Sequence, residues 1–564
     1  MALHAPESDL QNAGDRPSTW ESLLVESMRS QPVPSKELGR WLGALAHRPG
    51  WTATRLAGLC RQLVEVAAGA SDVAPSRGDK RFSDPAWTGN QFYRRLVQSY
   101  LVLGDRVHQL LEESELDQRT LSRLRFVVDN VLDAVSPSNT PIHPAALKEF
   151  IDTGGANISR GIRHAAADVR TRPRVPAMVD KTKFEVGVNL ASTPGTVVHR
   201  TPVFELIQYS PTTDRVRQTP LVLVPPTINK YYALDLAPAR SVVEYLVSQN
   251  QQVFVVSWRN PYARHASWGA DVYVKAVLDA IEVARQITRS EQAAVWGTCS
   301  GGIITAMALA HLYAKERGNE IAALVLPVTL LGKSENGTGL GDLFDEAMAQ
   351  RAIRRSEKIG YLDGAALAEV FAWLRPNDLI WSYWVNNYLL GRKPPAFDLL
   401  YWNADTTRMP ASLHRDFIDV AMGGGLEVPG TVIALDTPID LGQITADTYV
   451  VGAITDHITP WTGCYRTTQL LGGKTEFVLS NRGHIAALVN PPGAAKASYQ
   501  HSTDTPADPV EFHREATTHE GSWWPHFADW IGARTGELVP APKDPGRGIH
   551  RPLCAAPGTY VFEK

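Results

Sequence analysis

Short apolar runs alternate with longer amphipathic stretches from about residue 184 to the end of the chain. The short runs are continuous and rich in β-branched residues, which is typical of strands buried on both faces of a sheet. The longer stretches carry apolar residues at three- and four-residue spacing, as helices do. Such alternation predicts a mostly parallel sheet covered by helices on both faces, that is, an α/β domain over residues 181–564. We expect strands at 203–209, 221–224, 253–257, 293–296, 322–328, 449–453 and 477–479, and helices at 239–247, 272–287, 302–315 and 464–471.

Two parts of the chain depart from this alternation. Residues 1–180 show helical periodicity, clearest at 38–63 and 92–111, and little strand pattern, which predicts a helical N-terminal domain. Residues 330–445 separate two expected strands and are too many for a connecting loop. We therefore expect an inserted lid or cap subdomain there.

Composition excludes several functional classes. Among the 564 residues, 56 Lys and Arg face 59 Asp and Glu, so no basic excess points to nucleic acid as a partner. Four cysteines and a start without a secretory signal pattern are typical of a cytoplasmic protein. The uncharged stretch 293–310 has a small and polar middle, so we expect no transmembrane segment. Neither a His-Glu-x-x-His motif nor paired Cys-x-x-Cys motifs occur, so we expect no metal.

The candidate nucleophile is Cys299, in the sequence Gly-Thr-Cys-Ser-Gly at 297–301, between an expected strand and an expected helix. Glycines two positions to either side allow the sharp turn that carries a nucleophile in α/β hydrolases. The helix N-terminus favours a thiolate, and the backbone N–H of Ser300 is expected to face a developing oxyanion. The hydroxyl of Ser300 is the rival nucleophile, but a turn centred on it would need glycine at 298, where threonine stands.

A cysteine nucleophile needs a base, which in turn needs an orienting carboxylate. The expected order is nucleophile, acid and histidine, the last two after late strands. Asp456 follows the strand at 449–453, and His484 follows the next one. His457 competes for the base, although it directly follows Asp456. Asp447 competes for the acid, but it precedes its strand and should lie at the opposite end of the sheet.

The second oxyanion donor is expected from the loop after the strand at 221–224, with the backbone N–H of Ile228 or Asn229 as candidates. A thiolate attacks thioesters well and also leaves well, so a cysteine favours passing an acyl group to another nucleophile such as an alcohol. This favours an acyltransferase. A cysteine hydrolase or thioesterase of the same fold is the alternative, and a non-catalytic scaffold is a third.

Further motifs accompany the cysteine turn. They are F-S-D-P-A-W at 82–87, F-E-V-G-V-N-L-A at 184–191, P-P-T-I-N-K-Y-Y at 225–232, S-W-R-N-P at 257–261, Y-W-N-A-D at 401–405, D-H-I-T-P-W at 456–461, G-H-I-A at 483–486 and G-S-W-W-P at 521–525. Together with the cysteine turn, they resemble polyhydroxyalkanoate (PHA) synthases of the single-component type, class II-like or class I, over about residues 78–530.

The resemblance implies an α/β-hydrolase fold with a lid and an enzyme that polymerises (R)-3-hydroxyacyl-CoA into polyester, releasing CoA. It implies that Cys299 is acylated, that His484 is its general base and that Asp456 takes the third role, with a share in activating the incoming 3-hydroxyl. It also implies a homodimer at cytoplasmic polyester granules with granule-associated proteins. CoA is then a product and no cofactor is expected. Short-chain and medium-chain substrates both remain open.

Overall fold

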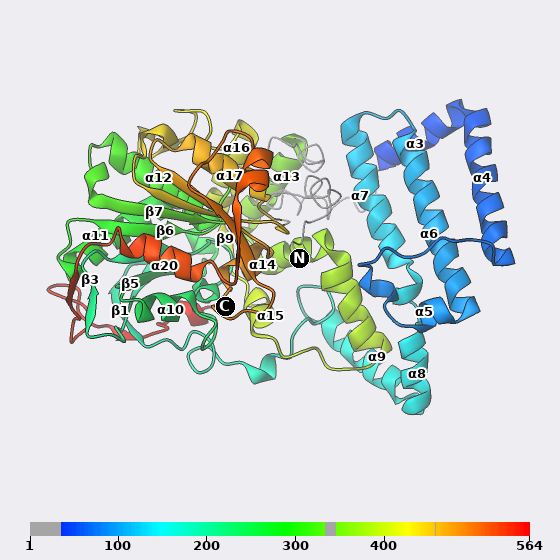
Figure 1. The fold of residues 1–564 in the computed structure, drawn as a ribbon, viewed down its shortest axis with the longest axis horizontal. Coiled ribbons are helices and arrows are strands. Elements are labelled where there is room, and N and C mark those ends of the chain that lie inside the picture. The colour runs from blue at the N-terminus through cyan, green and yellow to red at the C-terminus, as the bar shows by residue number, and fades with distance from the viewer. Residues whose placement is uncertain (1–34, 333–345, 457) are drawn as a thin grey trace.

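The centre of the molecule is an 11-stranded sheet in the order β15-β14-β13-β12-β7-β6-β4-β5-β2-β1-β17 (Figure 1). It is seen in a computed structural model that describes residues 35–332, 346–456 and 458–564. The described strands are β1 (Gly195–Arg200), β2 (Phe204–Tyr209), β3 (Arg215–Arg217), β4 (Leu221–Val224), β5 (Val253–Trp258), β6 (Ala293–Gly297), β7 (Ile321–Pro327), β8 (Tyr361–Leu362), β9 (Met409–Pro410), β10 (Ile433–Ala434), β11 (Thr437–Pro438), β12 (Thr448–Ala453), β13 (Thr475–Ser480), β14 (Ser498–Ser502), β15 (Thr517–Glu520), β16 (Leu538–Pro540) and β17 (Cys554–Ala555).

The predicted strands all form, and the prediction of a parallel sheet holds for its middle. Neighbours from β5 through β4, β6, β7 and β12 to β13 pair in parallel. Both edges are antiparallel, with β2, β1 and β17 on one side and β14 and β15 on the other. The edge strands β14 and β15 escaped prediction because they are largely polar and only partly buried, so they carry no apolar run.

Alternate side chains of the central strands enter two separate apolar layers. Val222 and Val224 of β4 pack in the layer formed by α11 (Ala270–Thr288) and α12 (Ser300–Ala314). Leu221 and Leu223 pack in the opposite layer with α10 (Val242–Ser248) and α20 (Trp524–Gly532). Burial on both faces explains why these strands are continuously apolar, and it leaves the strand ends as the place for polar chemistry.

Helices dominate the part of the chain before β1, as the periodicity predicts, and Figure 1 shows them in blue and cyan beside the sheet. The side chains of Asn90 and Asp117 accept backbone N–H bonds at two of the helix starts. The helices in this part are α3 (Ser35–His47), α4 (Pro49–Ala68), α5 (Ala86–Gly89), α6 (Gln91–Glu112), α7 (Gln118–Ala134), α8 (Pro144–Asp152) and α9 (Ala156–Val169).

Between β7 and β12 the chain leaves the sheet and forms a separate set of elements, here called the insertion. It reaches the N-terminal helices: Asn157 of α9 donates to the carbonyl of Leu389 at 2.9 Å, and Trp384 donates to the carbonyl of Asn139 at 3.0 Å. Its helical elements are α13 (Glu346–Ile359), α14 (Gly364–Leu374), the π-helical turns η9 (Asn377–Trp381) and η10 (Trp384–Leu389), α15 (Asp398–Asn403) and α16 (Ala411–Gly423).

The remaining helices follow β12 and cover the end of the sheet nearest β13. They are α17 (Trp461–Leu470), α18 (His484–Leu488) and α19 (Pro509–Glu515). Within the described ranges, no helix combines the length and the apolar character needed to cross a membrane.

Candidate active site

The turn between β6 and α12 holds Cys299 in a strained backbone conformation. Its φ is 51° and its ψ −122°, a combination that a residue with a side chain rarely adopts. Neighbouring glycines make the turn possible, because a Cβ on Gly301 would lie 2.2 Å from the carbonyl oxygen of Pro225. A Cβ on Gly297 would lie 2.6 Å from the hydroxyl of Thr305. The strand–turn–helix setting predicted for the cysteine is therefore present.

His484 and Asp456 meet at the carboxyl ends of neighbouring parallel strands. Asp456 follows β12, and His484 begins α18 just after β13. The Nδ1 atom of His484 lies 2.7 Å from Oδ2 of Asp456, and their side chains are 6% and 0% exposed. A buried, charge-assisted hydrogen bond of this kind fixes both the orientation and the tautomer of an imidazole.

Three further hydrogen bonds hold the Asp456 carboxylate. Its Oδ1 accepts the backbone N–H groups of Ile458 at 2.8 Å and Thr459 at 3.0 Å, and its Oδ2 accepts the Thr459 hydroxyl at 2.6 Å. Donors on both oxygens stabilise the ionised form and leave it one orientation. Sequence reasoning missed Thr459, although its position three residues after an aspartate that ends a strand is a recognisable turn signal.

The charge state of His484 is set by its neighbours. Burial on its own lowers the pKa of this imidazole, but the Asp456 carboxylate and a hydrogen bond with Cys299 outweigh it and raise the pKa. The protonated ring is therefore favoured in this site, as it must be if a proton is to move from the thiol to the imidazole.

The loop after β4 contacts the start of α12 next to Cys299. The backbone N–H of Thr227 donates to the Ser300 hydroxyl at 3.0 Å, which ties the loop to the nucleophile turn and occupies the rival nucleophile. Ile228 and Asn229 line the cavity that contains Cys299. In the described part of the chain, the backbone N–H groups of Ser300, Ile228 and Asn229 form no hydrogen bond to a backbone carbonyl.

A cavity of about 260 Å³ connects these groups, and its walls are mostly apolar. The insertion forms one side of it, including Arg375, which follows α14 and forms an ion pair with Asp378. The lining residues are Met178, Pro226, Ile228, Asn229, Cys299, Ala368, Ala372, Arg375, Leu379, Leu399, Leu400, Trp402, Asn403, Ile458, Gly483, His484, Ile485 and Ala486. The cavity suits an apolar acyl chain that ends at Cys299.

The structure also decides between rivals for the acid. Asp447 lies before β12, at the opposite end of the sheet from Cys299, and pairs with Arg534 at 2.9 Å. It is therefore no partner for His484. His457, the rival base, lies outside the described residues.

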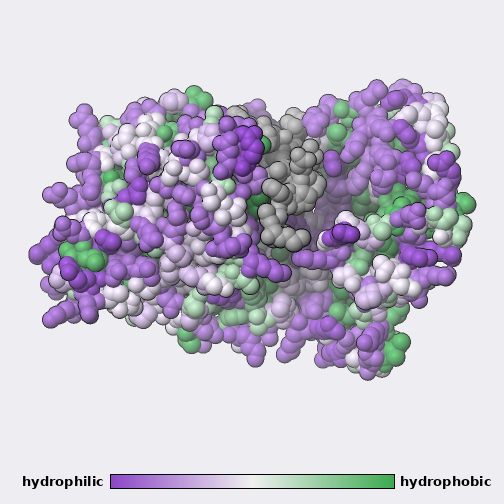
Figure 2. Space-filling model, viewed as in Figure 1, coloured by the Kyte–Doolittle hydropathy of each residue, from purple (hydrophilic) through white to green (hydrophobic). Residues whose placement is uncertain are grey.

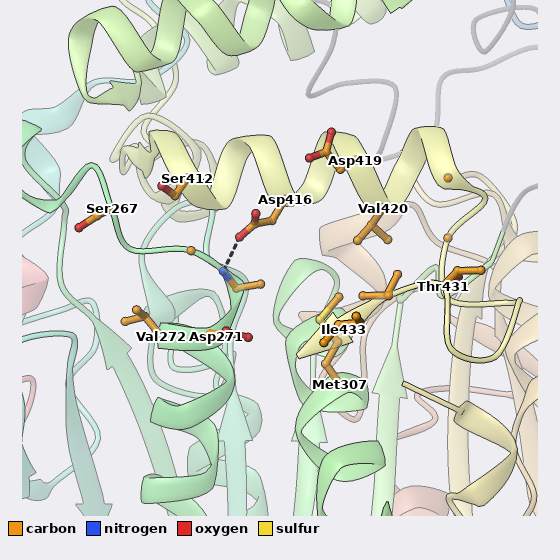
Figure 3. Close-up of a pocket in the computed structure, with 15 residues that line it drawn as sticks. Ser267, Asp271, Val272, Met307, Ser412, Asp416, Asp419, Val420, Thr431 and Ile433 are labelled. Carbon is orange, nitrogen blue, oxygen red and sulfur yellow. Dashed lines mark hydrogen bonds between the residues drawn. The ribbon is translucent and has the colours of Figure 1, made fainter. Parts of the chain in front are cut away.

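A second cavity, of about 490 Å³, lies between the start of α11 and the helix α16 (Figure 3). Asp416 reaches across it and accepts the backbone N–H of Ala270 at 2.6 Å. Asp271 and Asp419 also line it, but none of the predicted site residues does. The candidate active site is thus the smaller cavity.

A sheet with parallel centre, a strained nucleophile turn and a late acid and histidine defines an α/β-hydrolase fold with cysteine at the nucleophile position. Residues 220–491 match the family model of the alpha/beta hydrolase fold, which confirms the predicted fold class. Residues 78–246 match the model described as the N-terminus of poly-beta-hydroxybutyrate polymerase.

Curated relatives match along nearly the whole chain. Poly(3-hydroxyalkanoate) polymerases 1 and 2 of Ectopseudomonas oleovorans are 43% and 44% identical over 518 and 517 residues, each covering 92% of both chains. A poly(3-hydroxyalkanoate) polymerase subunit of Cupriavidus necator is 40% identical, over 88% of this chain and 85% of its own. The chain belongs to the poly(3-hydroxyalkanoate) polymerase family, so the predicted resemblance is confirmed and the chain is an enzyme of the acyltransferase type.

Proposed function

We propose that this enzyme polymerises (R)-3-hydroxyacyl-CoA through a Cys299–His484–Asp456 triad and a covalent acyl-cysteine, with release of CoA. The observation that carries the proposal is the 2.7 Å bond between His484 and Asp456, beside a strained Cys299 in one apolar cavity. An activated cysteine, an oriented base and an apolar acyl site are the parts that acyl transfer requires.

In the first half-reaction His484 takes the thiol proton of Cys299 at Nε2, while Asp456 holds Nδ1. The sulfur attacks the thioester carbonyl, and the oxyanion that forms is met by the backbone N–H of Ser300 and that of Ile228 or Asn229. The carbon–sulfur bond to CoA then breaks, and the leaving thiolate takes the proton from His484. Cys299 now carries the hydroxyacyl group as a thioester.

In the second half-reaction the 3-hydroxyl of another hydroxyacyl unit attacks the acyl-cysteine. His484 removes the hydroxyl proton, the ester bond forms, and the Cys299 thiolate leaves and is protonated again. The full set of hydrogen bonds on Asp456 and its 0% exposed side chain support an orienting role for this carboxylate. A direct proton transfer from the substrate hydroxyl to Asp456 is therefore less accessible than a transfer to His484.

Burial of the reacting groups supports transfer to an alcohol over transfer to water. The Cys299 and His484 residues are each 6% exposed, and aliphatic side chains surround them. Exclusion of water protects a thioester intermediate from hydrolysis. The cysteine hydrolase alternative requires water to reach the same carbonyl.

The proposal extends to the surface on which the product grows. Figure 2 shows green, hydrophobic patches among the polar side chains over the N-terminal helices, and we propose that this surface contacts polyester granules in the cytoplasm. A homodimer, granule-associated proteins and single-component activity are part of the same proposal. Within the helices themselves, the exposed large apolar residues are Leu42, Leu56, Val64, Phe92, Leu103, Val131, Leu147, Phe150, Ile151, Ile158, Ile162 and Val169.

The test is incubation of the purified chain with (R)-3-hydroxybutyryl-CoA and, separately, (R)-3-hydroxydecanoyl-CoA. Free thiol and product size are followed together, with Cys299→Ala as the control. We expect thiol release matched by insoluble polyester, and neither in the control. Thiol release with only the free hydroxy acid would establish the hydrolase instead. The substrate that reacts faster shows whether the enzyme prefers short-chain or medium-chain acyl groups.

A further inference from the structure

A cluster of side chains that could bind a metal ion lies outside the active site, near the edge of the sheet formed by β14 and β15. Glu476 of β13, His501 of β14 and His526 of α20 each offer one ligand atom, and these atoms lie within 4.8 Å of one another. Because Val478 pairs with His501 across the two strands, and Glu476 is two residues before Val478, both ligands project from the same face of the sheet. The helix α20 covers that face and adds His526.

The separations suit a tetrahedral ion. Zinc bonds of about 2.1 Å place neighbouring ligand atoms about 3.4 Å apart. The Nε2 atom of His501 already lies 3.2 Å from Oε2 of Glu476, and the His501 and His526 ring centroids are 4.2 Å apart. All three ligand atoms lie within 4.8 Å of one another, so binding an ion requires the set to contract.

Glu476 and His526 each have a hydrogen-bond partner on the atom that would face away from the ion. Trp530 donates its indole N–H to Oε1 of Glu476 at 3.0 Å, which leaves Oε2 for the ion. The Tyr449 hydroxyl lies 2.8 Å from Nδ1 of His526, which leaves Nε2. Outer hydrogen bonds of this kind orient metal ligands and select the tautomer that binds.

Arg534 approaches Glu476 at 3.9 Å, but on the Oε1 side, and it pairs more closely with Asp447 at 2.9 Å.

We propose that Glu476, His501 and His526 bind a divalent transition-metal ion, with zinc as the ion that the two imidazoles and one carboxylate favour. The fourth position is left to water. The ion clamps β13, β14 and α20 together. Since β13 runs on towards His484, the site stabilises the edge of the sheet from which the histidine projects, and it takes no part in the chemistry.

The test is zinc binding by the demetallated full-length chain, measured by equilibrium dialysis and followed by a cobalt titration. We expect one zinc ion per chain and a higher melting temperature with zinc. His501→Gln and His526→Gln should each weaken binding about tenfold to a hundredfold. His108→Gln is the matched control, because His108 also pairs with a carboxylate, Asp129 at 2.6 Å, away from the cluster; binding should not change.

Tyr449→Phe provides a second route if a histidine variant does not fold, since it removes only the hydroxyl beside His526. It should weaken zinc binding about tenfold. Cobalt at the proposed site should show visible bands without the intense near-ultraviolet band of a thiolate ligand. Absence of zinc binding, equal binding by the histidine variants, or a thiolate band that disappears in Cys299→Ala would overturn the proposal.

Discussion

The hydroxyl of Thr459 offers the sharpest test of how the site orients its base. It donates to Oδ2 of Asp456 at 2.6 Å, the same oxygen that faces Nδ1 of His484 at 2.7 Å. Thr459→Val keeps the shape of the side chain and removes this hydroxyl, which also lies 3.1 Å from Nδ1 of His484. The two backbone N–H bonds to Oδ1 remain, so the carboxylate loses its second anchor on the side that faces the histidine.

A hydrogen bond to a charged group contributes about 1.5–3 kcal/mol. If the loss falls on the transition state, in which the imidazole is charged, it lowers kcat/KM by about ten- to a hundredfold, since about 1.4 kcal/mol is tenfold in rate. The Asp456 carboxylate should also be held less firmly. We therefore expect kcat to fall and KM to change little.

The assay is the initial rate of CoA release with polyester yield, alongside the melting temperature of each variant. Thr459→Ser keeps the hydroxyl and should stay near the parental rate. Equal losses in Thr459→Val and Thr459→Ser would mean that packing of the methyl group matters and the hydrogen bond does not. A Thr459→Val enzyme within twofold of the parent would refute the reasoning.

Three more outcomes follow from the same geometry. Cys299→Ser should fold normally and lose most turnover, as measured by CoA release, because its hydroxyl is a poorer nucleophile; near-parental polymerisation would contradict the thiolate mechanism. Gly301→Ala should lower the free energy of unfolding by about 1–3 kcal/mol and abolish activity, since its Cβ would meet the Pro225 carbonyl at 2.2 Å; an unchanged melting curve would count against this. The raised pKa of His484 means that its pairing with Asp456 stabilises the fold fully below the ordinary histidine pKa of 6.5 and is lost as pH rises towards about 10. The melting-temperature gap between the parent and Asp456→Asn should therefore narrow from pH 7 to pH 10, and a constant gap would disprove the coupling.

Much of the fold is predictable from local pattern. Strands β4, β5 and β6 are short apolar runs because both of their faces are covered, and α11 repeats apolar residues at helical spacing for the same reason. The polar strands β14 and β15 lie at the edge, partly exposed, so no comparable pattern marks them. Their pairing depends on β13, a neighbour that the local sequence does not specify.

The predicted site residues divide in the same way. The Gly-Thr-Cys-Ser-Gly turn can be recognised locally, because its glycines stand where a Cβ would clash and they flank the strained Cys299. The positions of Asp456 and His484 after strands follow from the topology of the sheet. The role of each residue in catalysis stays a prediction for the assays above.

The sequence by itself determined the buried central strands with the helices between them, the nucleophile turn and the motifs that mark the family, since each is written within a few consecutive residues. Only the tertiary structure decided that Thr459 bonds Asp456, that the insertion walls the acyl cavity, and that Glu476, His501 and His526 converge. Those contacts join separate elements, and the distance between two elements depends on how the whole core packs rather than on any local pattern.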